Sequence, residues 1–344
     1  AAKKNFASPF LLWNSEMWRG TIIIRVSYIN KKEGKDMIYQ NVLEAVGNTP
    51  LIRLAHLTGE NDAEVLVKFE AVNIGGSIKT RTALNMIEKA EQEGLIHKDT
   101  IIVEPTSGNQ GIGLALIGAV KGYKTIIIMP DSVSEERQKL VEQYGATVKL
   151  IHDAGNIGEC IENCLKEALK MQRENPNVFV PQQFENVANA QAHRMGTGAE
   201  ILAQAGKKID GFCCGFGTGG TITGVGEVLK AAWPDIEIWV AEPENAAILS
   251  GKKVGTHVQM GIGDGIIPGI MNREIYDEIT IVTDEEALGM AKRLAKEEGL
   301  LCGISSGTNT VAALRLAKKL GKGKTVVTIL PDTAERYFST PLFD

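Results

Sequence analysis

The chain has 344 residues, of which 44% are hydrophobic and 23% are charged, and its formal net charge is −5. These values are typical of a globular protein with one large or two smaller α/β domains. The negative charge argues against a nucleic-acid-binding protein, which needs a clustered basic surface. No apolar run approaches the roughly 18 residues of a membrane span.

The five cysteines follow neither a disulfide pattern nor a metal-binding pattern. Cys160 and Cys164 fall on one face of a predicted helix, but no histidine or further cysteine completes a ligand set. We therefore expect no metal site, and we expect a cytoplasmic location in which thiols stay reduced.

The first 36 residues read differently from the rest of the chain. The apolar run "FLLW" is too short for the core of a signal peptide, and no small-residue cleavage site follows it. The segment "KKEGKDM", Lys31 to Met37, back-translates to codons that resemble a bacterial ribosome-binding sequence before a start codon. We hypothesise that residues 1–36 are a non-native extension and that Met37 is the true start. The alternative is a native arm that docks on a partner subunit.

From residue 98 onward, short β-branched runs alternate with amphipathic stretches. The pattern predicts a first series of strands over 100–105, 124–130, 146–152 and 178–181, separated by helices over 109–123, 134–145 and 159–175. A second series has strands predicted over 210–216, 236–243, 277–282 and 324–331, with helices over 219–233 and 284–299. Such alternation favours parallel sheets with helices on both faces, so we expect an α/β fold with two lobes.

The first candidate loop is "NIGGSIKTRT", residues 73–82, which contains Lys79. Ligands of open α/β sheets bind beyond the carboxyl ends of strands, so strand-following and helix-opening loops are where chemistry is expected. A lysine beside a helix start and apolar neighbours can lose part of its charge and form a Schiff base. Gly75 and Gly76 let backbone approach a ligand closely. The alternative is an ordinary solvated lysine.

The second candidate loop is "PTSGNQG", Pro105 to Gly111, between a predicted strand and a predicted helix. Thr106, Ser107 and Asn109 supply hydroxyl and amide groups at a helix N-terminus, where anions are favoured. An ordinary N-cap turn needs fewer such residues. The loop therefore favours an anion-binding site.

The third candidate loop is "GFGTGGTITG", Gly215 to Gly224, whose amides can cradle a phosphate at the start of a helix. Gly215, Gly217 and Gly220 also satisfy the G-x-G-x-x-G pattern, and Glu242 ends the next strand. This loop alone does not distinguish a dinucleotide site from a simple phosphate cup.

The fourth candidate loop is "GISSGTN", Gly303 to Asn309, in which Ser305 and Ser306 open a predicted helix. A serine N-cap is the plain interpretation of this loop taken alone. Together, a Schiff-base lysine, an anion loop, a phosphate cup and a hydroxyl indicate a pyridoxal phosphate site, in which the protein orients a cofactor that acts as electron sink.

Seven motifs resemble those of the cysteine synthase family, the O-acetylserine sulfhydrylases. They are "GNTPLIRL", "NIGGSIKTR", "EPTSGNQGIGLA", "QFEN", "GTGGTITG", "GISSGTN" and "LPDTAERYFST", in register from about Met37 to the C-terminus. The resemblance implies a fold-type II pyridoxal phosphate enzyme, similar to the tryptophan synthase β subunit, with two three-layer αβα lobes and mostly parallel sheets. It implies a smaller mobile lobe over 71–181 and a larger phosphate-binding lobe over 37–70 plus 182–344. It also argues against a dinucleotide.

The resemblance implies a role for each matched residue. Lys79 matches the Schiff-base lysine that later moves the α-proton, and Ser305 matches the hydroxyl that faces the pyridine nitrogen. Asn109 matches the residue that binds the ring hydroxyl. The phosphate cup is matched by Gly217, Thr218, Gly219, Gly220 and Thr221. The substrate carboxylate is expected at Thr106, Ser107, Asn109, Gln110 and Gln183. A homodimer is implied, and a serine acetyltransferase is a candidate partner.

The chain departs from the family pattern at several site positions. Ile74 stands where proline is usual, Thr80 where aspartate is usual and Gln110 where threonine is usual. In "MGIGDGIIP", Asp264 replaces a small apolar residue and Ile266 replaces an aromatic one. In the family this loop faces the β-substituent of the substrate, so these two positions bear on which reaction is catalysed.

The resemblance and its departures leave two enzymatic interpretations. The first is β-replacement through an aminoacrylate that makes L-cysteine and acetate from O-acetyl-L-serine and sulfide. In the second, Asp264 deprotonates water and L-cysteine is converted to L-serine and hydrogen sulfide. Alternatively, Asp264 caps its own loop and faces away from the site. A non-catalytic pyridoxal phosphate protein that serves as a binding partner is a more remote alternative.

Overall fold

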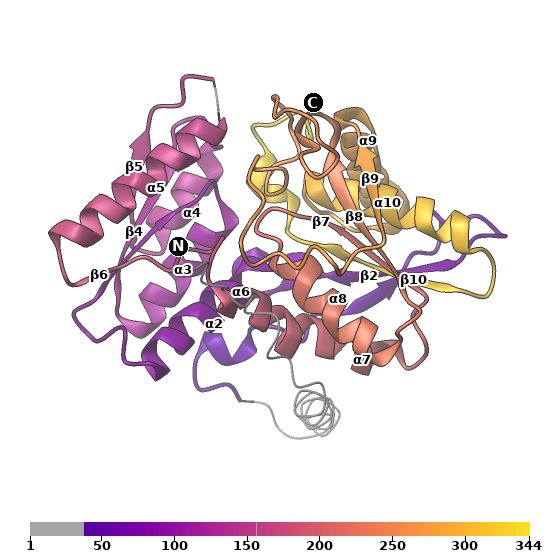
Figure 1. Ribbon diagram of the computed structural model, residues 1–344, viewed down its shortest axis with the longest axis horizontal. Coiled ribbons are helices and arrows are strands. Elements are labelled where there is room, and N and C mark those ends of the chain that lie inside the picture. Colours follow the sequence, from indigo (N-terminus) through magenta and orange to yellow (C-terminus); the bar gives the residue numbers. More distant parts are fainter. Residues whose placement is uncertain (1–37, 156) are drawn as a thin grey trace, which may run out of the picture.

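The computed structural model describes residues 38–155 and 157–344, so the hypothesis on residues 1–36 falls outside the described residues. The chain forms two lobes, each built around its own sheet, that lie side by side (Figure 1). The predicted α/β class is confirmed. Within the described residues, no helix is long and apolar enough to cross a membrane, and no group of acidic, histidine and cysteine side chains is arranged to hold a metal ion.

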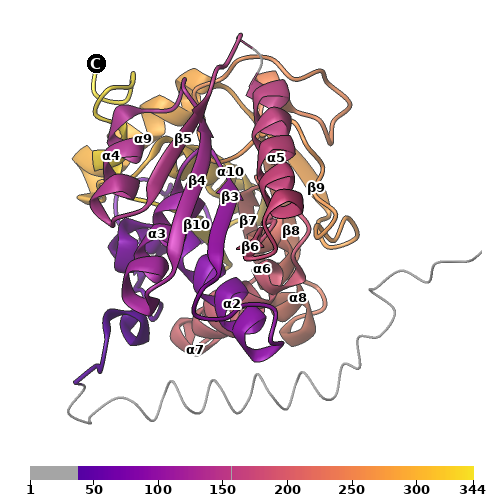
Figure 2. The ribbon, with the colours of Figure 1, turned by 90° about the vertical axis from the view of Figure 1, so that its left-hand side faces the viewer.

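The smaller sheet has four parallel strands in the order β5–β4–β3–β6. These strands are β3 (Ile101–Pro105), β4 (Lys124–Pro130), β5 (Thr147–Ile151) and β6 (Val178–Phe179). The helices that accompany them are α2 (Lys79–Gln92), α3 (Asn109–Lys121), α4 (Glu135–Gln143) and α5 (Ile157–Glu174). In Figure 2, α5 covers one face of this sheet while α3 and α4 cover the other.

The larger sheet has six strands in the order β1–β2–β10–β7–β8–β9, and only the β1–β2 pair is antiparallel. The strands are β1 (Leu51–Arg53), β2 (Glu64–Phe69), β7 (Gly211–Gly215), β8 (Glu237–Pro243), β9 (Glu278–Val282) and β10 (Thr325–Leu330). Its helices are α6 (Val187–Ala192), α7 (Ala199–Ala205), α8 (Gly220–Ala232), α9 (Asp284–Glu298) and α10 (Ile304–Leu320), with a π-helical turn over His193–Gly198.

Both sheets are buried on both faces, as parallel sheets require. In the smaller sheet, Ile102 packs with α3 and α4, whereas its neighbour Val103 packs with α5. In the larger sheet, Val326 packs with α9 and α10, whereas Val327 packs with α7 and α8. Successive strand residues point to opposite faces, so each continuous β-branched run contributes side chains to the hydrophobic cores on both faces of its sheet.

The two predicted series of strands and helices are confirmed as elements. β6 is shorter than predicted and stops before Pro181, which lacks the N–H that would continue the ladder. The β1–β2 hairpin and the helices between β6 and β7 were not predicted. These elements are short, and they pack against elements that are distant along the chain. The periodicity of the sequence reveals neither a very short element nor a contact with a distant one.

Candidate active site

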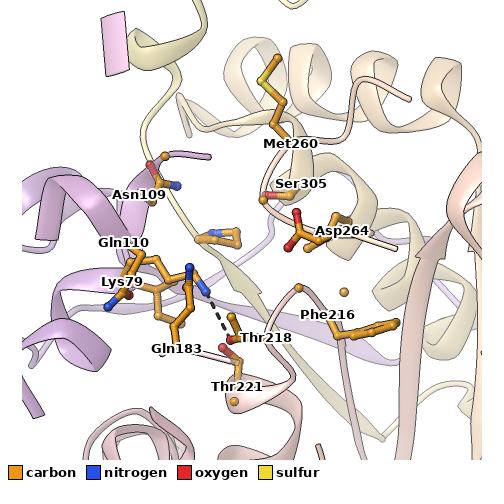
Figure 3. Close-up of a pocket in the computed structure, with 18 of the residues that line it drawn as sticks. Lys79, Asn109, Gln110, Gln183, Phe216, Thr218, Thr221, Met260, Asp264 and Ser305 are labelled. Carbon is orange, nitrogen blue, oxygen red and sulfur yellow. Dashed lines mark hydrogen bonds between the residues drawn. The ribbon is translucent and has the colours of Figure 1, made fainter. Parts of the chain in front are cut away.

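One pocket lies between the lobes, where β3, β7 and β10 end (Figure 3). The structure brings every residue predicted for the site to its lining: Lys79, Thr106, Ser107, Asn109, Gln110, Gln183, Gly217, Thr218, Gly219, Gly220, Thr221, Asp264 and Ser305. We call the part formed by Lys79, 217–221 and Ser305 the cofactor end. The part formed by Arg137, Met260 and Asp264 is called the substituent end.

Lys79 is the first residue of α2, and its Nζ points at residues 217–221, which we call the phosphate-cup loop. The Nζ atom lies 3.5 Å from Thr218 Oγ1 (Figure 3). Burial lowers the pKa of Lys79, and the negative charge of Asp264 opposes this shift. A lysine whose pKa is lowered is more readily deprotonated, and only the deprotonated amine is a nucleophile.

A buried ion-pair network holds the start of α2, and therefore Lys79, in place. Arg81 donates to Glu70 Oε2 at 2.9 Å and to Glu200 Oε1 at 2.6 Å. Lys68 forms a further buried ion pair with Glu200 at 2.7 Å. Removing one partner of such a buried network typically costs about 3–5 kcal/mol because the remaining charge is left uncompensated. The network anchors the first turn of α2 to the larger lobe.

The phosphate-cup loop packs closely against the surrounding chain, which is possible only because three of its residues are glycine. A Cβ on Gly217 would lie 2.6 Å from the carbonyl oxygen of Gly261, and a Cβ on Gly220 would collide with Asn189 Oδ1. Gly219 has a φ of 72°, which favours glycine. Asn189 Nδ2 donates to Thr218 Oγ1 at 2.9 Å, which fixes that hydroxyl.

The helices that begin at the pocket receive no side-chain hydrogen bond from their N-cap residues. This holds for α2, α3, α8 and α10, which begin at Lys79, Asn109, Gly220 and Ile304. By contrast α9, which begins away from the pocket, has a complete capping box between Thr283 and Glu286. Uncapped N-terminal amides attract anions through both hydrogen bonding and the helix dipole. The pocket therefore favours an anionic ligand.

The loop over Pro105 to Gly111, which we call the anion loop, is held by side-chain hydrogen bonds with the C-terminal segment and within the loop itself. Asn109 Nδ2 donates to Asp332 Oδ2 at 2.6 Å, and Asn109 Oδ1 accepts from Arg336. Thr106 Oγ1 accepts from the amide of Gly108 at 3.2 Å, which shapes the turn into α3. The side chain of Asn109 is thus positioned by the C-terminal segment of the larger lobe.

Gln183 lies on a second loop that is fastened to β3 by a buried carboxylate. The amides of Gln182 and Gln183 each donate to a Glu104 oxygen at 2.9 Å. Gln182 has a φ of 56°, an unusual value for a residue other than glycine. Burial raises the pKa of Glu104 to about 7, although the two amides oppose this shift.

Ser305 lies in the first turn of α10 and is 4% exposed. The N-cap of α10 is Gly303, with no side-chain hydrogen bond, so the capping interpretation of this serine is wrong. The hydroxyl of Ser305 therefore remains available to the pocket.

Asp264 lines the pocket instead of capping its own loop (Figure 3). Its Oδ2 would be 3.0 Å from a Cβ on Gly217, which places the carboxylate beside the start of the phosphate cup. Burial raises the pKa of Asp264, and the positive charges of Lys79, His257 and Arg137 oppose this shift. His257 also supports the loop, because its Nε2 lies 3.1 Å from the carbonyl oxygen of Gly263.

Sequence reasoning missed several pocket residues that come from distant elements. Arg137 reaches the pocket from α4, and Met260 is the first residue of the loop that carries Asp264. Behind the pocket lining, His193 is buried and its Nε2 lies 3.3 Å from Thr221 Oγ1, while burial lowers its pKa well below the ordinary value. Arg137 lies on α4, which contains no glycine, so no local signal identifies it.

The departures at Ile74, Thr80 and Gln110 have different environments. Ile74 packs against the core of the smaller lobe. Thr80 is fully buried, and its hydroxyl has no hydrogen-bond partner among the described residues. Gln110 Oε1 accepts from Thr82 Oγ1 at 2.7 Å, which leaves its Nε2 without a described partner.

Glu242 is not placed to bind a nucleotide ribose. Its carboxylate accepts from the amides of Leu249 and Ser250 and from the Ser250 hydroxyl, at 2.7–3.1 Å. The G-x-G-x-x-G match in the phosphate-cup loop therefore lacks the acidic partner of a dinucleotide site.

Comparisons with known proteins agree with this geometry. The sequence profile described as pyridoxal-phosphate dependent enzyme matches residues 42–332. A cysteine synthase from Staphylococcus aureus (strain N315) is 51% identical over 304 residues, covering 88% of this chain and 96% of that protein. A solved hydrogen sulfide-producing enzyme from Fusobacterium nucleatum is 40% identical, with a TM-score of 0.83, covering 87% of this chain and 100% of that one. A solved cysteine synthase from Entamoeba histolytica is 38% identical, with a TM-score of 0.84, covering 91% and 93%.

These matches confirm the predicted fold class and cofactor. The relatives are fold-type II enzymes with mostly parallel sheets, and the matching family depends on pyridoxal phosphate. The chain therefore belongs to the pyridoxal-phosphate dependent enzymes and, within them, to the cysteine synthase family.

Proposed function

We propose that the protein is a pyridoxal-phosphate dependent β-replacement enzyme that makes L-cysteine and acetate from O-acetyl-L-serine and sulfide. The observation that supports this most is the single pocket that gathers Lys79, the phosphate-cup loop and the anion loop. The cysteine synthases among its relatives support the same substrates.

The residues of the cofactor end fit the cofactor. Lys79 would hold it covalently, the amides of 217–221 would hold its phosphate, and Ser305 and Asn109 would face its ring. When bound, the cofactor supplies an electron sink that weakens bonds at Cα and Cβ of an amino acid. A neutral hydroxyl at Ser305 leaves a ring nitrogen unprotonated more readily than a carboxylate would.

The anion loop and Gln183 orient the amino-acid substrate. The amides at the start of α3 favour its carboxylate, and the hydroxyls of Thr106 and Ser107 add hydrogen-bonding groups beside them. Gln110 contributes an Nε2 donor without a described partner. Orientation of this kind brings the α-proton of the substrate within reach of Lys79 Nζ.

A second candidate reaction is the conversion of L-cysteine and water to L-serine and hydrogen sulfide. Asp264 favours it, because a carboxylate with a raised pKa is a stronger base and can take a proton from water. The same charge would repel an incoming hydrosulfide anion. The hydrogen sulfide-producing enzyme from Fusobacterium nucleatum is among the similar structures.

Product analysis separates the two reactions. The protein is incubated with L-cysteine alone, and sulfide, serine, pyruvate and lanthionine are assayed; a parallel reaction contains O-acetyl-L-serine and sulfide. If Asp264 activates water, Asp264→Ala loses serine formation by about 10²-fold or more and gains cysteine synthesis.

Asp264→Asn is the matched control, since it removes the charge while retaining the shape. Both variants should change in the same direction if charge is the cause. Unchanged rates of both reactions in Asp264→Ala would overturn the role of Asp264 and leave cysteine synthesis as the proposed activity.

We also propose that residues 71–181 form a smaller lobe that closes on substrate against residues 37–70 and 182–344. All four strands of the smaller sheet fall within 71–181, which supports this division. Spin labels at the exposed positions Val120 and Val254 would report a shorter distance when O-acetyl-L-serine binds. An unchanged distance would contradict closure.

The resemblance to cysteine synthases further supports a homodimer, a cytoplasmic location and a serine acetyltransferase as partner. The five cysteines are buried and free, which agrees with a reducing compartment. Sedimentation with and without a serine acetyltransferase tests both assemblies. A protein that sediments as a monomer, with or without the serine acetyltransferase, would refute both the homodimer and the complex.

A further inference from the structure

The guanidinium of Arg137 is a buried cation at the pocket without a carboxylate partner among the described residues. Arg137 is 2% exposed, and no ion pair is formed by it in the part of the chain that the structure describes. Its Nε atom has no hydrogen-bond partner there. Buried arginines are normally paired, because an uncompensated buried charge is costly.

The acceptors that the Arg137 guanidinium does contact are uncharged. One terminal nitrogen lies 3.4 Å from the carbonyl oxygen of Ser107 and 3.2 Å from Met260 Sδ. Its Cζ atom lies 4.9 Å from the centre of the Tyr337 ring. A thioether is a poor substitute for a carboxylate, and an unbranched methionine side chain is easily displaced.

The position of Arg137 is made possible by Gly108 in the anion loop. A Cβ on Gly108 would lie 2.9 Å from Arg137 Nε, so only glycine lets the guanidinium lie against this turn. From there the side chain spans the two lobes, since Ser107 belongs to the anion loop and Met260 begins the loop of Asp264. Arg137 thus faces the substituent end, where a second substrate would enter.

We propose that Arg137 is a carboxylate-binding subsite for the acceptor thiol, so that the enzyme accepts mercapto-acids as well as sulfide. The planar guanidinium binds a carboxylate through two parallel hydrogen bonds, and such binding displaces Met260 Sδ. This inference rests on the proposed β-replacement function. Asp264 lies at the same end and keeps its role toward the acceptor proton.

The reaction implied for a mercapto-acid balances. The thiol sulfur of 3-mercaptopropionate forms a bond to Cβ of O-acetyl-L-serine, and the Cβ–O bond breaks. Acetate leaves with the bonding electron pair, and the thiol proton is released. The products are S-(2-carboxyethyl)-L-cysteine, acetate and one proton.

The test compares three acceptors: 3-mercaptopropionate, cysteamine and sulfide. 3-Mercaptopropionate carries a carboxylate, cysteamine carries an amine on a chain of similar length, and sulfide carries neither. In the wild type, kcat/KM should be higher for 3-mercaptopropionate than for cysteamine. Arg137→Gln should lower the ratio of kcat/KM for 3-mercaptopropionate to that for sulfide by about ten- to a hundredfold. Arg137→Lys keeps the charge but loses the planar fork, so it should recover only part of this ratio.

Binding of the products gives a second readout that does not depend on turnover. Calorimetry compares S-(2-carboxyethyl)-L-cysteine with S-(2-aminoethyl)-L-cysteine on the wild-type holoenzyme and on Arg137→Gln. The wild type should bind the carboxylated product more tightly, and the variant should lose that preference. This readout also serves if a variant folds poorly, because the wild-type preference alone is informative.

The outcomes show whether Arg137 binds the carboxylate of the acceptor, binds the carboxylate of the donor or has a structural role only. Equal loss of kcat/KM for all three acceptors would overturn the proposal and make Arg137 a structural link between the lobes. A selective rise in KM for O-acetyl-L-serine would also overturn it, because Arg137 would then bind the carboxylate of the donor. A wild type that is inactive with sulfide but prefers the carboxylated product would refute cysteine synthesis while supporting this subsite.

Discussion

The two ends of the pocket are built from different materials. The cofactor end is made of backbone amides, glycines and neutral hydroxyls, with Lys79 as its only charged side chain among the described residues. The substituent end has a buried cation, Arg137, and a carboxylate, Asp264, that form no ion pair with each other in the described chain. A site made of backbone groups requires glycines at particular neighbouring positions, so it leaves a local sequence pattern. Charged side chains that meet only in the folded protein leave no such pattern. The residues of the first end were therefore predicted from motifs, whereas in the second end Asp264 was predicted and Arg137 was not.

Replacing Lys79 with alanine should have the largest effect, because it removes the amine at the cofactor end. We expect Lys79→Ala to lower kcat/KM for O-acetyl-L-serine and sulfide by about 10²–10⁴-fold or more, since proton transfer alone contributes that much. The absorbance of the bound cofactor should also change.

Lys89→Ala is the matched control, as Lys89 lies on the same helix and pairs with Glu93 on the surface. It should leave kcat/KM and absorbance unchanged. Equal activity in the two variants would show that the cofactor end is not organised around Lys79.

Gly220→Ala tests whether the cofactor end depends on close backbone approach. The added methyl group would collide with Asn189 Oδ1, which should displace the start of α8 or the Thr218 hydroxyl that Asn189 holds. Overpacking of this kind typically costs about 1–3 kcal/mol, so cofactor affinity should fall by roughly 10–100-fold. Equilibrium dialysis of the cofactor measures this change.

Gly289→Ala provides the comparison, because Gly289 lies within α9 and a Cβ there meets no atom within 4 Å. Cofactor affinity should be unaffected, and the variant should be slightly more stable, by about 0.5–1 kcal/mol. Equal cofactor affinities in Gly220→Ala and Gly289→Ala would contradict the steric account of the phosphate cup.

The last test concerns stability rather than activity and uses Glu104, whose pKa, like that of Asp264, is raised by burial. The pKa of Glu104 is about 7 in the fold against an ordinary 4.5, so the native state binds more protons between these values. Stability contributed by this group therefore falls as pH rises from 4.5 to 7, by about 3 kcal/mol in all.

Glu104→Gln removes this titration. Relative to the wild type, the variant should be less stable near pH 5, and the difference should shrink by about that amount toward pH 8. Urea unfolding of both proteins at the two pH values measures it. A difference that does not vary with pH would show that Glu104 does not titrate in this range.

The sequence allowed much of the fold to be predicted, for a physical reason. Parallel strands buried on both faces need unbroken β-branched runs, such as those containing Ile102 and Val326, and the helices between them need an apolar stripe. The β1–β2 hairpin escaped prediction because three-residue β1 is too short to show a period. Its stability depends on pairing with β10 at the far end of the chain through β2.

The candidate site divides in the same way. Gly217, Gly219 and Gly220 were identified because ligand approach and backbone geometry constrain those positions directly. Asp264 was noticed as a departure from a pattern, but its direction could not be predicted, since a carboxylate in a loop can face either way. Arg137 could not be predicted, because an arginine on an amphipathic helix is ordinarily solvated.

The sequence by itself determined the α/β alternation and the family to which the chain belongs, and it predicted the glycine-rich loop that lines the pocket. Only the tertiary structure decided that Asp264 faces the pocket and that Arg137 joins it from α4, with Gly108 making room. The reason is that local patterns encode backbone geometry and burial over a few residues. The electrostatic environment of a pocket is instead summed over side chains that are distant along the chain and adjacent only after folding.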